Sequence, residues 1–262
     1  MIRLGVAQQT ADDSLERNLA RVEHSVAQAR ALGCAALCLP ECCLTGYYPA
    51  RAGELAISAA DPALDALADM AREYGLDVLA GFMERAQARA YITHAIFRPD
   101  GTRDHYRKTH LGERERQHFE PGERLDVFGL TCGLKAGVQL CVEAHFPEIT
   151  QTLSLHGAQV VFAPHASPMQ APRRRALWQL LMPARAYDNR VYMACSNQWD
   201  GARYGGGCLV AGPDGALTAE CWRDEPAVLA FDVDEVELQR YHAPDADIRH
   251  RYFPGLRRAE LY

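Results

Sequence analysis

The sequence has no surplus of basic residues and no long apolar run. It contains 28 Lys and Arg against 34 Asp and Glu, which gives a net charge of −6. General nucleic-acid binding needs a positive surface, so this balance argues against it. The longest apolar runs are far shorter than the roughly 20 residues of a membrane-spanning helix, and residues 1–7 are typical of a strand, unlike a signal peptide. We therefore expect a cytoplasmic protein that binds neither nucleic acid nor membranes.

Several motifs that mark common enzyme chemistries are also missing. The chain has no His-Glu-x-x-His, no Gly-x-Ser-x-Gly, no phosphate-binding loop and no Gly-x-Gly-x-x-Gly. Zinc-protease, serine-hydrolase, nucleotide and dinucleotide chemistry therefore have no support in the sequence. We expect a site that needs no organic cofactor.

The cysteines indicate free thiols. Their number, nine, is odd, and they are scattered, often within apolar strings, which is unlike a disulfide framework. Cys34, Cys38, Cys42 and Cys43 lie close together in the sequence, which invites comparison with a metal site. Structural zinc sites use tightly paired cysteines, however, and no Cys-x-x-Cys pair exists. We expect the first two to be small core residues and expect no metal site.

The chain shows the organisation of one α/β domain. It has 262 residues, of which 48% are hydrophobic, and it contains no internal repeat or low-complexity linker. We therefore expect a single domain over residues 1–262. Short apolar runs alternate with longer amphipathic ones, as in layered α/β proteins. The predicted strands are 2–8, 36–39, 77–82, 92–98, 135–141, 160–163, 191–196, 208–211 and 228–233.

Helix signals occur between these strands. The first helix is predicted to begin at Asp13, with Glu16 at the capping-box position, and Gly33 is predicted to end it. Apolar residues every third or fourth position mark the face that this helix buries. Further helices are predicted at 62–74, 146–156 and 172–189.

The last predicted helix has two unusual features. Pro183 should kink or break it, because proline has no N–H to donate and its ring crowds the preceding turn. Its first turn contains Arg173, Arg174 and Arg175, a local exception to the acidic composition. We expect these three arginines to form an exposed helix start.

Three residues with complementary chemistry each follow, or lie beside, a predicted strand: Glu41, Lys108 and Cys141. Functional side chains gather at strand ends in α/β sheets, so these three are candidates to converge. A glutamate can take the thiol proton, and a lysine can hold the thiolate and then a tetrahedral oxyanion. The backbone N–H of Val142 offers a second oxyanion donor. Each side chain also has an ordinary alternative: a turn carboxylate, a surface charge and a core thiol.

The segments around these residues resemble those of the nitrilase superfamily of carbon–nitrogen hydrolases. The glutamate, lysine and cysteine segments occur in the family's order and read LPECCLTGY (39–47), YRKTHL (106–111) and GVQLCVEAHFPE (137–148). Similar flanking segments are found at 157–164, 185–189, 212–215 and 256–262. The resemblance covers nearly the whole chain. It implies an α-β-β-α sandwich of two packed sheets with outer helices.

The resemblance also implies residue roles: Glu41 as general base, Lys108 as oxyanion stabiliser and Cys141 as nucleophile. Many members use a second glutamate, four residues before the Phe of a Phe-x-Pro-Gly segment. Here that segment is FEPG at 119–122, so Glu115 matches, and the nearby Glu113 is the alternative.

The family further implies a homodimer or larger assembly. The predicted helices 146–156 and 172–189 would pack against their copies in a partner. The second of these offers Leu177, Trp178, Leu180, Leu181 and Met182 as apolar surface, although burial within one chain is the alternative.

Departures from the family pattern occur just after Cys141. Many members have Tyr-Asp there, whereas this chain has Val142 and Glu143, which keeps a carboxylate on a longer side chain. D-carbamoylase-like members carry arginines soon after the cysteine, which bind a substrate carboxylate. Here that region has Ala144 and His145, which disfavours a carbamoyl amino-acid substrate.

We therefore expect an enzyme that releases ammonia from a small carboxamide or carbamoyl compound through a Cys thioester, with a nitrile as the alternative substrate. Tyr47, Val142, His145 and His165 are expected at the substrate pocket, and the two histidines and the tyrosine have ordinary structural alternatives.

Two other classes of protein stay open. One is a thiol hydrolase with a Cys–His pair, which would use His110, His145 or His165; the other is a non-catalytic binding protein on the same fold.

Overall fold

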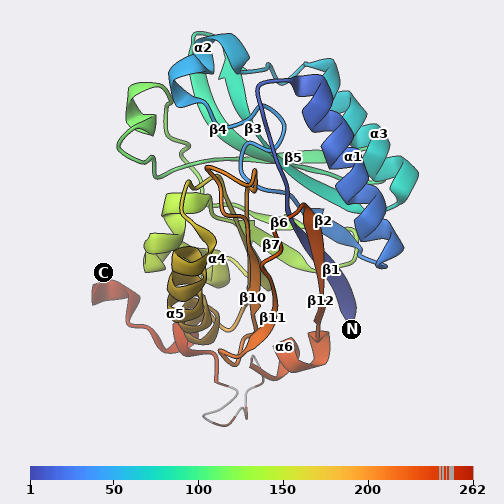
Figure 1. Ribbon diagram of the computed structural model, residues 1–262. Helices are drawn as coiled ribbons and strands as arrows, with labels where there is room; N and C mark the ends of the chain where they lie inside the picture. Colours follow the sequence, from blue (N-terminus) through green and yellow to red (C-terminus); the bar gives the residue numbers. More distant parts are fainter. Residues whose placement is uncertain (242, 244, 246, 248–250, 262) are drawn as a thin grey trace.

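Two six-stranded sheets form the centre of the structure (Figure 1). The computed structural model describes residues 1–241, 243, 245, 247 and 251–261. The first sheet has the order β12 (Ala227–Val233), β1 (Ile2–Gln8), β2 (Ala36–Cys38), β3 (Asp77–Ala86), β4 (Arg89–Phe97) and β5 (Arg103–Arg107). The second has the order β11 (Leu217–Cys221), β10 (Cys208–Ala211), β9 (Tyr192–Asn197), β8 (Val160–His165), β7 (Lys135–Val138) and β6 (Val127–Gly129).

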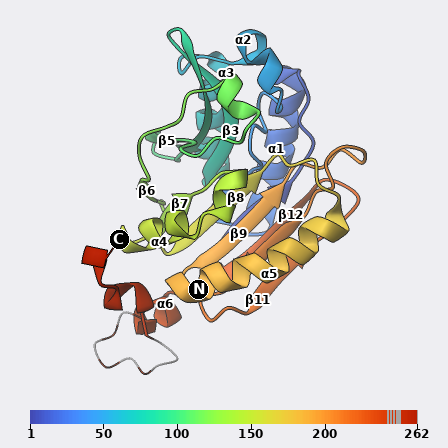
Figure 2. The same ribbon diagram turned by 90° about the vertical axis from the view of Figure 1, so that its left-hand side faces the viewer.

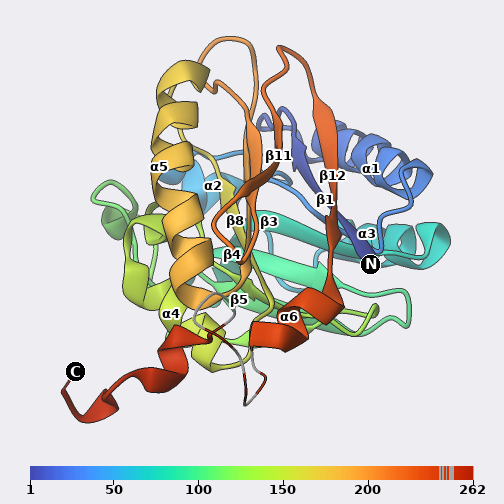
Figure 3. The same cartoon turned by 90° about the horizontal axis from the view of Figure 1, so that it is seen from below.

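Helices cover the outer faces of both sheets (Figure 3). The first sheet carries α1 (Leu15–Ala31) and α3 (Pro62–Tyr74), and the second carries α4 (Pro147–Leu155) and α5 (Ala171–Asn189). The shorter elements are α2 (Ala52–Leu55), α6 (Glu235–Tyr241), η1 (Pro49–Arg51), η2 (Glu115–Gln117), η3 (Cys141–His145), η4 (Phe253–Leu256) and η5 (Ala259–Leu261). Among the described residues, no helix is both long and apolar enough to cross a membrane.

Alternate residues of each strand fill different layers of the core. In β1, Leu4 packs between the sheets, whereas Ala7 faces the layer of α1 and α3. In β8, Phe162 packs between the sheets and Ala163 faces α4 and α5. Sheets that are buried on both faces have strands with near-continuous apolar runs, which explains why the sequence reveals these strands. The predicted α-β-β-α sandwich is confirmed.

The strands that the sequence did not predict lie at sheet edges. β5 is one edge of the first sheet, and β6 and β11 are the two edges of the second. β5 reads RDHYR, and its first three residues are exposed. Edge strands are commonly short and charged because this prevents pairing with other chains. They therefore lack the apolar pattern that identifies the buried strands.

The start of α1 differs from the prediction. Ser14, and not Asp13, is the N-cap, because its hydroxyl accepts a hydrogen bond from the N–H of Arg17. Asp13 instead pairs with Arg51 at 2.9 Å. The end agrees with the prediction, since Gly33 adopts a φ of 77° just beyond the helix.

The helix α5 differs from the prediction in three respects: it has no break at Pro183, part of its apolar face is buried, and one of its first-turn arginines is buried. It continues through Pro183 without a break in the assigned helix (Figure 2). Trp178 and Met182 are buried against the second sheet and offer no surface to a partner. Of the arginines in its first turn, only the outer two are exposed, and Arg174 has just 3% of its surface exposed. One of the three arginine side chains in this turn, that of Arg174, is therefore buried inside the protein.

A close backbone approach at Gly81 positions the turn that follows β2. The carbonyl of Gly81 accepts a hydrogen bond from the N–H of Leu44 at 3.0 Å. A Cβ at Gly81 would lie 2.6 Å from the backbone nitrogen of Cys42 and 3.2 Å from the carbonyl carbon of Glu41. Only glycine allows the turn to pack this tightly on β3.

We predict that Gly81→Ala lowers the free energy of unfolding by about 1–3 kcal/mol, because the added methyl group forces the turn at Glu41 away from β3. Urea unfolding measures this change. Gly129→Ala is the matched control: a Cβ there meets no atom within 4 Å, so its effect stays within about 0.5 kcal/mol. Equal stability of the two variants would contradict the prediction.

Candidate active site

A buried cluster of three charged side chains lies at one end of the sandwich. Glu41 follows β2, Lys108 follows β5, and Glu115 begins η2. The Lys108 ammonium donates hydrogen bonds to Glu41 Oε1 at 2.8 Å and to Glu115 Oε1 at 2.7 Å. β2 and β5 run in the same direction, so their carboxyl ends meet at one edge of the sheet. The structure thus brings two of the predicted residues, Glu41 and Lys108, into direct contact.

Glu41 follows a strand of the first sheet and is held by donors from the second. Its Oε2 accepts a hydrogen bond from the backbone N–H of Ala166, just after β8, at 3.0 Å. Its backbone carbonyl accepts from the side-chain amide of Gln198, just after β9, at 2.8 Å. Burial raises the pKa of the Glu41 carboxyl above its ordinary value, although Lys108 acts in the opposite direction. A carboxyl group of this kind is suited to exchange protons near neutral pH.

The structure distinguishes the two candidates for the second glutamate. Glu115 is buried and contacts Lys108, whereas Glu113 is exposed. Glu115 Oε1 also accepts from the hydroxyl of Tyr47 at 2.8 Å, and its Oε2 accepts from the N–H of Gly112 at 2.6 Å. Tyr47 therefore lies beside the cluster, and its place in a substrate pocket stays a prediction.

Lys108 stays charged in this buried position. Burial alone would lower the pKa of its amine, but Glu41, Cys141 and Glu115 outweigh burial and raise that pKa well above its ordinary value. The lysine carries one positive charge, and the two carboxylates around it can carry two negative charges. Lys108 therefore offers a fixed ammonium that does not give up its proton.

Cys141 lies beyond β7, at the start of η3, with an unusual backbone conformation. Its φ is 50°, a region that few residues other than glycine occupy. Burial and the carboxylate of Glu41 raise the pKa of the Cys141 thiol to about 12, although Lys108 and Arg174 lower it. The sequence led us to expect a thiolate, with the glutamate as acceptor of its proton and the lysine holding its charge. In the resting protein the group is a thiol, because burial and Glu41 outweigh the cations.

One buried carboxylate that the sequence reading left without a role, Glu143, connects the lysine segment to the cysteine turn. Its Oε1 accepts hydrogen bonds from the hydroxyl of Tyr106 and from the N–H and hydroxyl of Thr109, at 2.7–2.8 Å, and from the N–H of His110 at 3.0 Å. Its Oε2 accepts from the N–H of Leu140 at 2.6 Å. Glu143 thereby fixes the chain next to Lys108 against the chain next to Cys141. Its place two residues after the cysteine was the available sequence signal.

The predicted pocket residues have different surroundings. Val142 is half-buried in η3, and His145 is exposed. His165 is buried, its Nδ1 donates to the carbonyl of Ala163 at 2.8 Å, and its ring meets that of Trp178 edge-on at 5.0 Å. Burial and the charge of Arg174 hold the pKa of His165 well below its ordinary value, so the ring is neutral.

The histidines give little support to a Cys–His pair. His110 is exposed and packs against the ring of Phe146, and His145 is exposed as well. Within the described part of the chain, no hydrogen bond or ion pair joins Cys141 to a histidine. The groups whose charges act on the thiol most strongly are Glu41 and Lys108.

The cysteine cluster of the sequence does not converge in space. Cys38 and Cys42 belong to the core between the sheets, whereas Cys34 and Cys43 belong to the layer beneath α1 and α3. All nine cysteines are free thiols. In the residues that the structure describes, no group of three or more His, Cys, Asp or Glu side chains is arranged to hold a metal ion.

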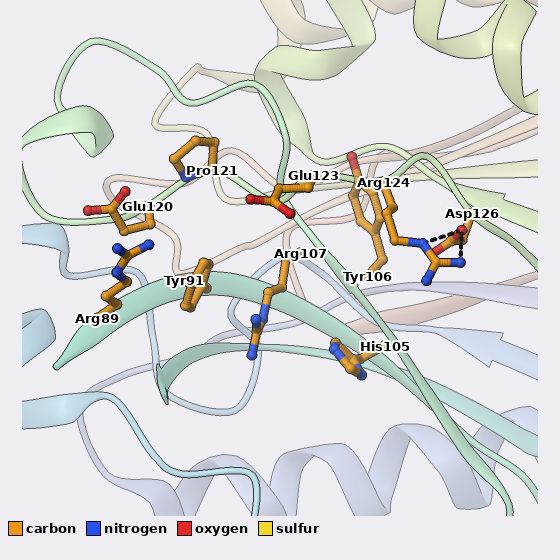
Figure 4. A pocket seen from close by; sticks show the side chains of 11 residues that line it. Arg89, Tyr91, His105, Tyr106, Arg107, Glu120, Pro121, Glu123, Arg124 and Asp126 are labelled. Atoms are coloured by element: carbon orange, nitrogen blue, oxygen red, sulfur yellow. Dashed lines mark hydrogen bonds and ion pairs between the residues drawn. The ribbon is translucent and has the colours of Figure 1, made fainter. Parts of the chain in front are cut away.

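A surface cavity of about 330 Å³ is lined by residues of the strand that leads to Lys108 (Figure 4). Its wall is formed by β4, β5 and the segment 120–126. Arg107 lies 4.1 Å from the ring centre of Tyr91 and pairs with Glu84. The N–H of Gly122 donates to the carbonyl of Lys108 at 2.8 Å. The side chains of the charged cluster do not line this cavity. The contacts in its wall instead hold the segment that carries Lys108.

The chain is similar to several known proteins over most of its length. The family model for carbon–nitrogen hydrolases matches residues 3–243. An (R)-stereoselective amidase from Pseudomonas sp is 30% identical over 212 residues, which cover 78% of this chain and 75% of the relative. A nitrilase from Pyrococcus abyssi is 31% identical over 228 residues, which cover 84% of each. The structure of the NitN amidase from Nesterenkonia sp. AN1 is similar with a TM-score of 0.85 and 26% identity, covering 100% of this chain and 98% of that one.

The family match, the curated relatives and the shared architecture all span most of the chain. They confirm the resemblance that the glutamate, lysine and cysteine segments indicated. The chain belongs to the carbon–nitrogen hydrolase family, within the nitrilase superfamily, and is a carbon–nitrogen hydrolase.

Proposed function

We propose that this enzyme hydrolyses a small carboxamide through a thioester on Cys141. The observation that carries the proposal is the buried ammonium of Lys108 between two carboxylates, with the Cys141 thiol close enough for all three charges to act on it. The related Nesterenkonia amidase supports it, since its glutamate variants show acrylamide and the acetamide moiety of fluoroacetamide added covalently at the active-site cysteine.

In the first half-reaction, the sulfur of Cys141 attacks the amide carbon while the thiol proton passes to Glu41. The carbonyl electron pair moves to oxygen, and the resulting oxyanion is stabilised by the ammonium of Lys108 and the N–H of Val142. The carbon–nitrogen bond then breaks, the nitrogen takes the proton from Glu41, and ammonia leaves. A thioester remains on Cys141.

In the second half-reaction, Glu41 takes a proton from a water molecule, which attacks the thioester carbon. The carbon–sulfur bond breaks, the sulfur regains a proton, and the carboxylic acid is released. The raised pKa of Glu41, caused by burial, suits both directions of proton transfer. Glu115 and Tyr47 keep Lys108 in place and are positioning residues in this scheme.

We predict that the enzyme releases ammonia from small amides and that Cys141→Ala abolishes this release. Lys108→Met lowers kcat at least roughly 100- to 1000-fold, because an oxyanion donor and a full charge are lost. Glu41→Gln allows a slowly formed thioester to accumulate, since its hydrolysis also needs the base. Ammonia assays over amides, carbamoyl compounds and nitriles, together with mass spectrometry, measure these effects.

The control for this prediction is the set of histidine variants. His110→Ala and His145→Ala keep measurable turnover, and His165→Ala changes chiefly the substrate affinity. An essential histidine together with a nearly normal Lys108→Met variant would refute the proposal. Turnover of nitriles alone would instead assign nitrile hydrolysis to the same residues.

We predict that alkylation of Cys141 inactivates the enzyme and that alkylation of other cysteines does not. Six of the other thiols are buried, and only Cys132 and Cys221 are half-buried. Because the pKa of Cys141 is raised to about 12 by burial and Glu41, its alkylation by iodoacetamide accelerates steadily from pH 6 to pH 9. Peptide mapping over time identifies the thiol, and inactivation that tracks Cys42 or Cys43 would contradict the assignment.

We propose that α4 and α5 form the interface of a homodimer or larger assembly. Phe146 and Leu155 at the ends of α4, and Leu180 and Tyr187 on α5, are exposed large apolar side chains. They lie on the two helices that the family resemblance assigns to a partner contact. Exposed apolar patches mark protein contacts more often than isolated apolar residues do, so these side chains are candidates for such a contact.

We predict at least a dimer by light scattering at micromolar concentration, and a shift toward monomer in Leu180→Asp, because the charge would be buried in the interface. Val236→Asp, at an equally exposed apolar residue on α6, is the control and leaves the assembly intact. A mass of 29.1 kDa for the unaltered protein would rule out the proposal.

A further inference from the structure

Arg174 is a buried cation without a carboxylate partner. It lies in the first turn of α5, with 3% of its surface exposed. Within the described part of the chain, its guanidinium forms no ion pair, and its Nε has no hydrogen-bond partner. Its contacts are the hydroxyl of Ser167, to which Nη2 donates, and the ring of Trp178 at 5.4 Å. Buried charges are normally paired, so this side chain needs an explanation.

Among the residues that the structure describes, no carboxylate pairs with Arg174. The first turn of α5 contains no acidic residue, and no side chain caps this helix. The positive end of the helix therefore adds to the charge of the guanidinium. Burial lowers the pKa of Arg174 below its ordinary value, which reflects a charge whose loss of water is not compensated. Lys108, in contrast, is held by two carboxylates.

Arg174 lies beside the catalytic groups. Its partner Ser167 directly follows Ala166, whose N–H binds Glu41. Asn197 holds Ser167 through two hydrogen bonds, of 2.9 and 3.1 Å, so the position of the arginine is fixed before any ligand binds. The charge of Arg174 also lowers the pKa of Cys141.

We propose that Arg174 binds a carboxylate of the substrate, so that the preferred substrates are small amides that also carry an acid group. The planar guanidinium matches a carboxylate with two parallel hydrogen bonds. The inference rests on the amide hydrolysis proposed above and names its substrate class. The sequence disfavoured carbamoyl amino acids because Ala144 and His145 replace the arginines that follow the cysteine in other members. Arg174 supplies such a cation from α5 instead, so these compounds belong to the proposed class.

The test compares amides of matched shape and different charge. Succinamate carries a carboxylate, 4-methylpentanamide has an uncharged isopropyl group in its place, and 4-aminobutanamide carries a cation. We expect kcat/KM for succinamate to exceed that for the neutral amide roughly 100-fold, chiefly through KM, with the cationic amide poorest. In Arg174→Met the ratio of succinamate to neutral amide falls to near one. Arg173→Met, at the exposed neighbour, keeps the ratio of the unaltered enzyme.

Two results would overturn the proposal. One is an unaltered enzyme that does not prefer succinamate. The other is an Arg174→Met variant that loses kcat equally for all three amides and shifts its pH profile, because the arginine would then act on the Cys141 thiol. If Arg174→Met does not fold, as judged by thermal unfolding, competitive inhibition of the unaltered enzyme tests the proposal in its place. Succinate should then inhibit far more strongly than butyrate, and equal inhibition would refute the proposal.

A binding measurement separates this inference from the proposed reaction. Cys141→Ala cannot turn over, but calorimetry should still detect succinamate binding more tightly than 4-methylpentanamide. If no amide releases ammonia but succinamate still binds selectively, the proposed reaction is refuted and the carboxylate site is supported. Ammonia release without any preference for the charged amide would refute only the carboxylate site.

Discussion

The ammonium of Lys108, buried between Glu41 and Glu115, is the interaction on which this end of the molecule depends. A charge removed from water costs several kcal/mol unless partners compensate it. The two carboxylates do so at 2.8 and 2.7 Å, and backbone and side-chain donors from both sheets hold them in turn. The same burial raises the pKa of Glu41 and keeps Cys141 a thiol. In the mechanism proposed above, proton transfer between these two groups is therefore part of the reaction and does not precede it.

The carboxylate of Glu143 makes the lysine and the cysteine one unit. It accepts hydrogen bonds from the chain on both sides, near Lys108 in the first sheet and before Cys141 in the second. The donors are mostly backbone N–H groups, so the bonds set the course of the chain itself. Pre-organised charges of this kind stabilise a developing oxyanion without rearrangement during the reaction. The strained φ of 50° at Cys141 persists within this framework.

Two of the buried cations, Lys108 and Arg174, illustrate different uses of charge. Lys108 is fully compensated within the chain, whereas Arg174 has a hydroxyl and an aromatic ring. Both lie at the same end of the sandwich, beside Cys141. In the proposals above, Lys108 serves the hydrolysis and Arg174 binds the carboxylate of the substrate. The distinction depends on contacts between elements that are far apart in the sequence.

The sequence by itself determined the layered fold, the buried strands and Glu41, Lys108 and Cys141 as candidates, because apolar runs and residue chemistry are local properties. It missed the edge strands β5, β6 and β11, whose charged or short segments have no such pattern. Only the tertiary structure decided that Glu115 and not Glu113 meets the lysine, that Glu143 joins two segments, and that Arg174 turns inward from a run of three arginines. Burial and partners arise from packing between distant elements, and a single residue type or spacing does not contain that information.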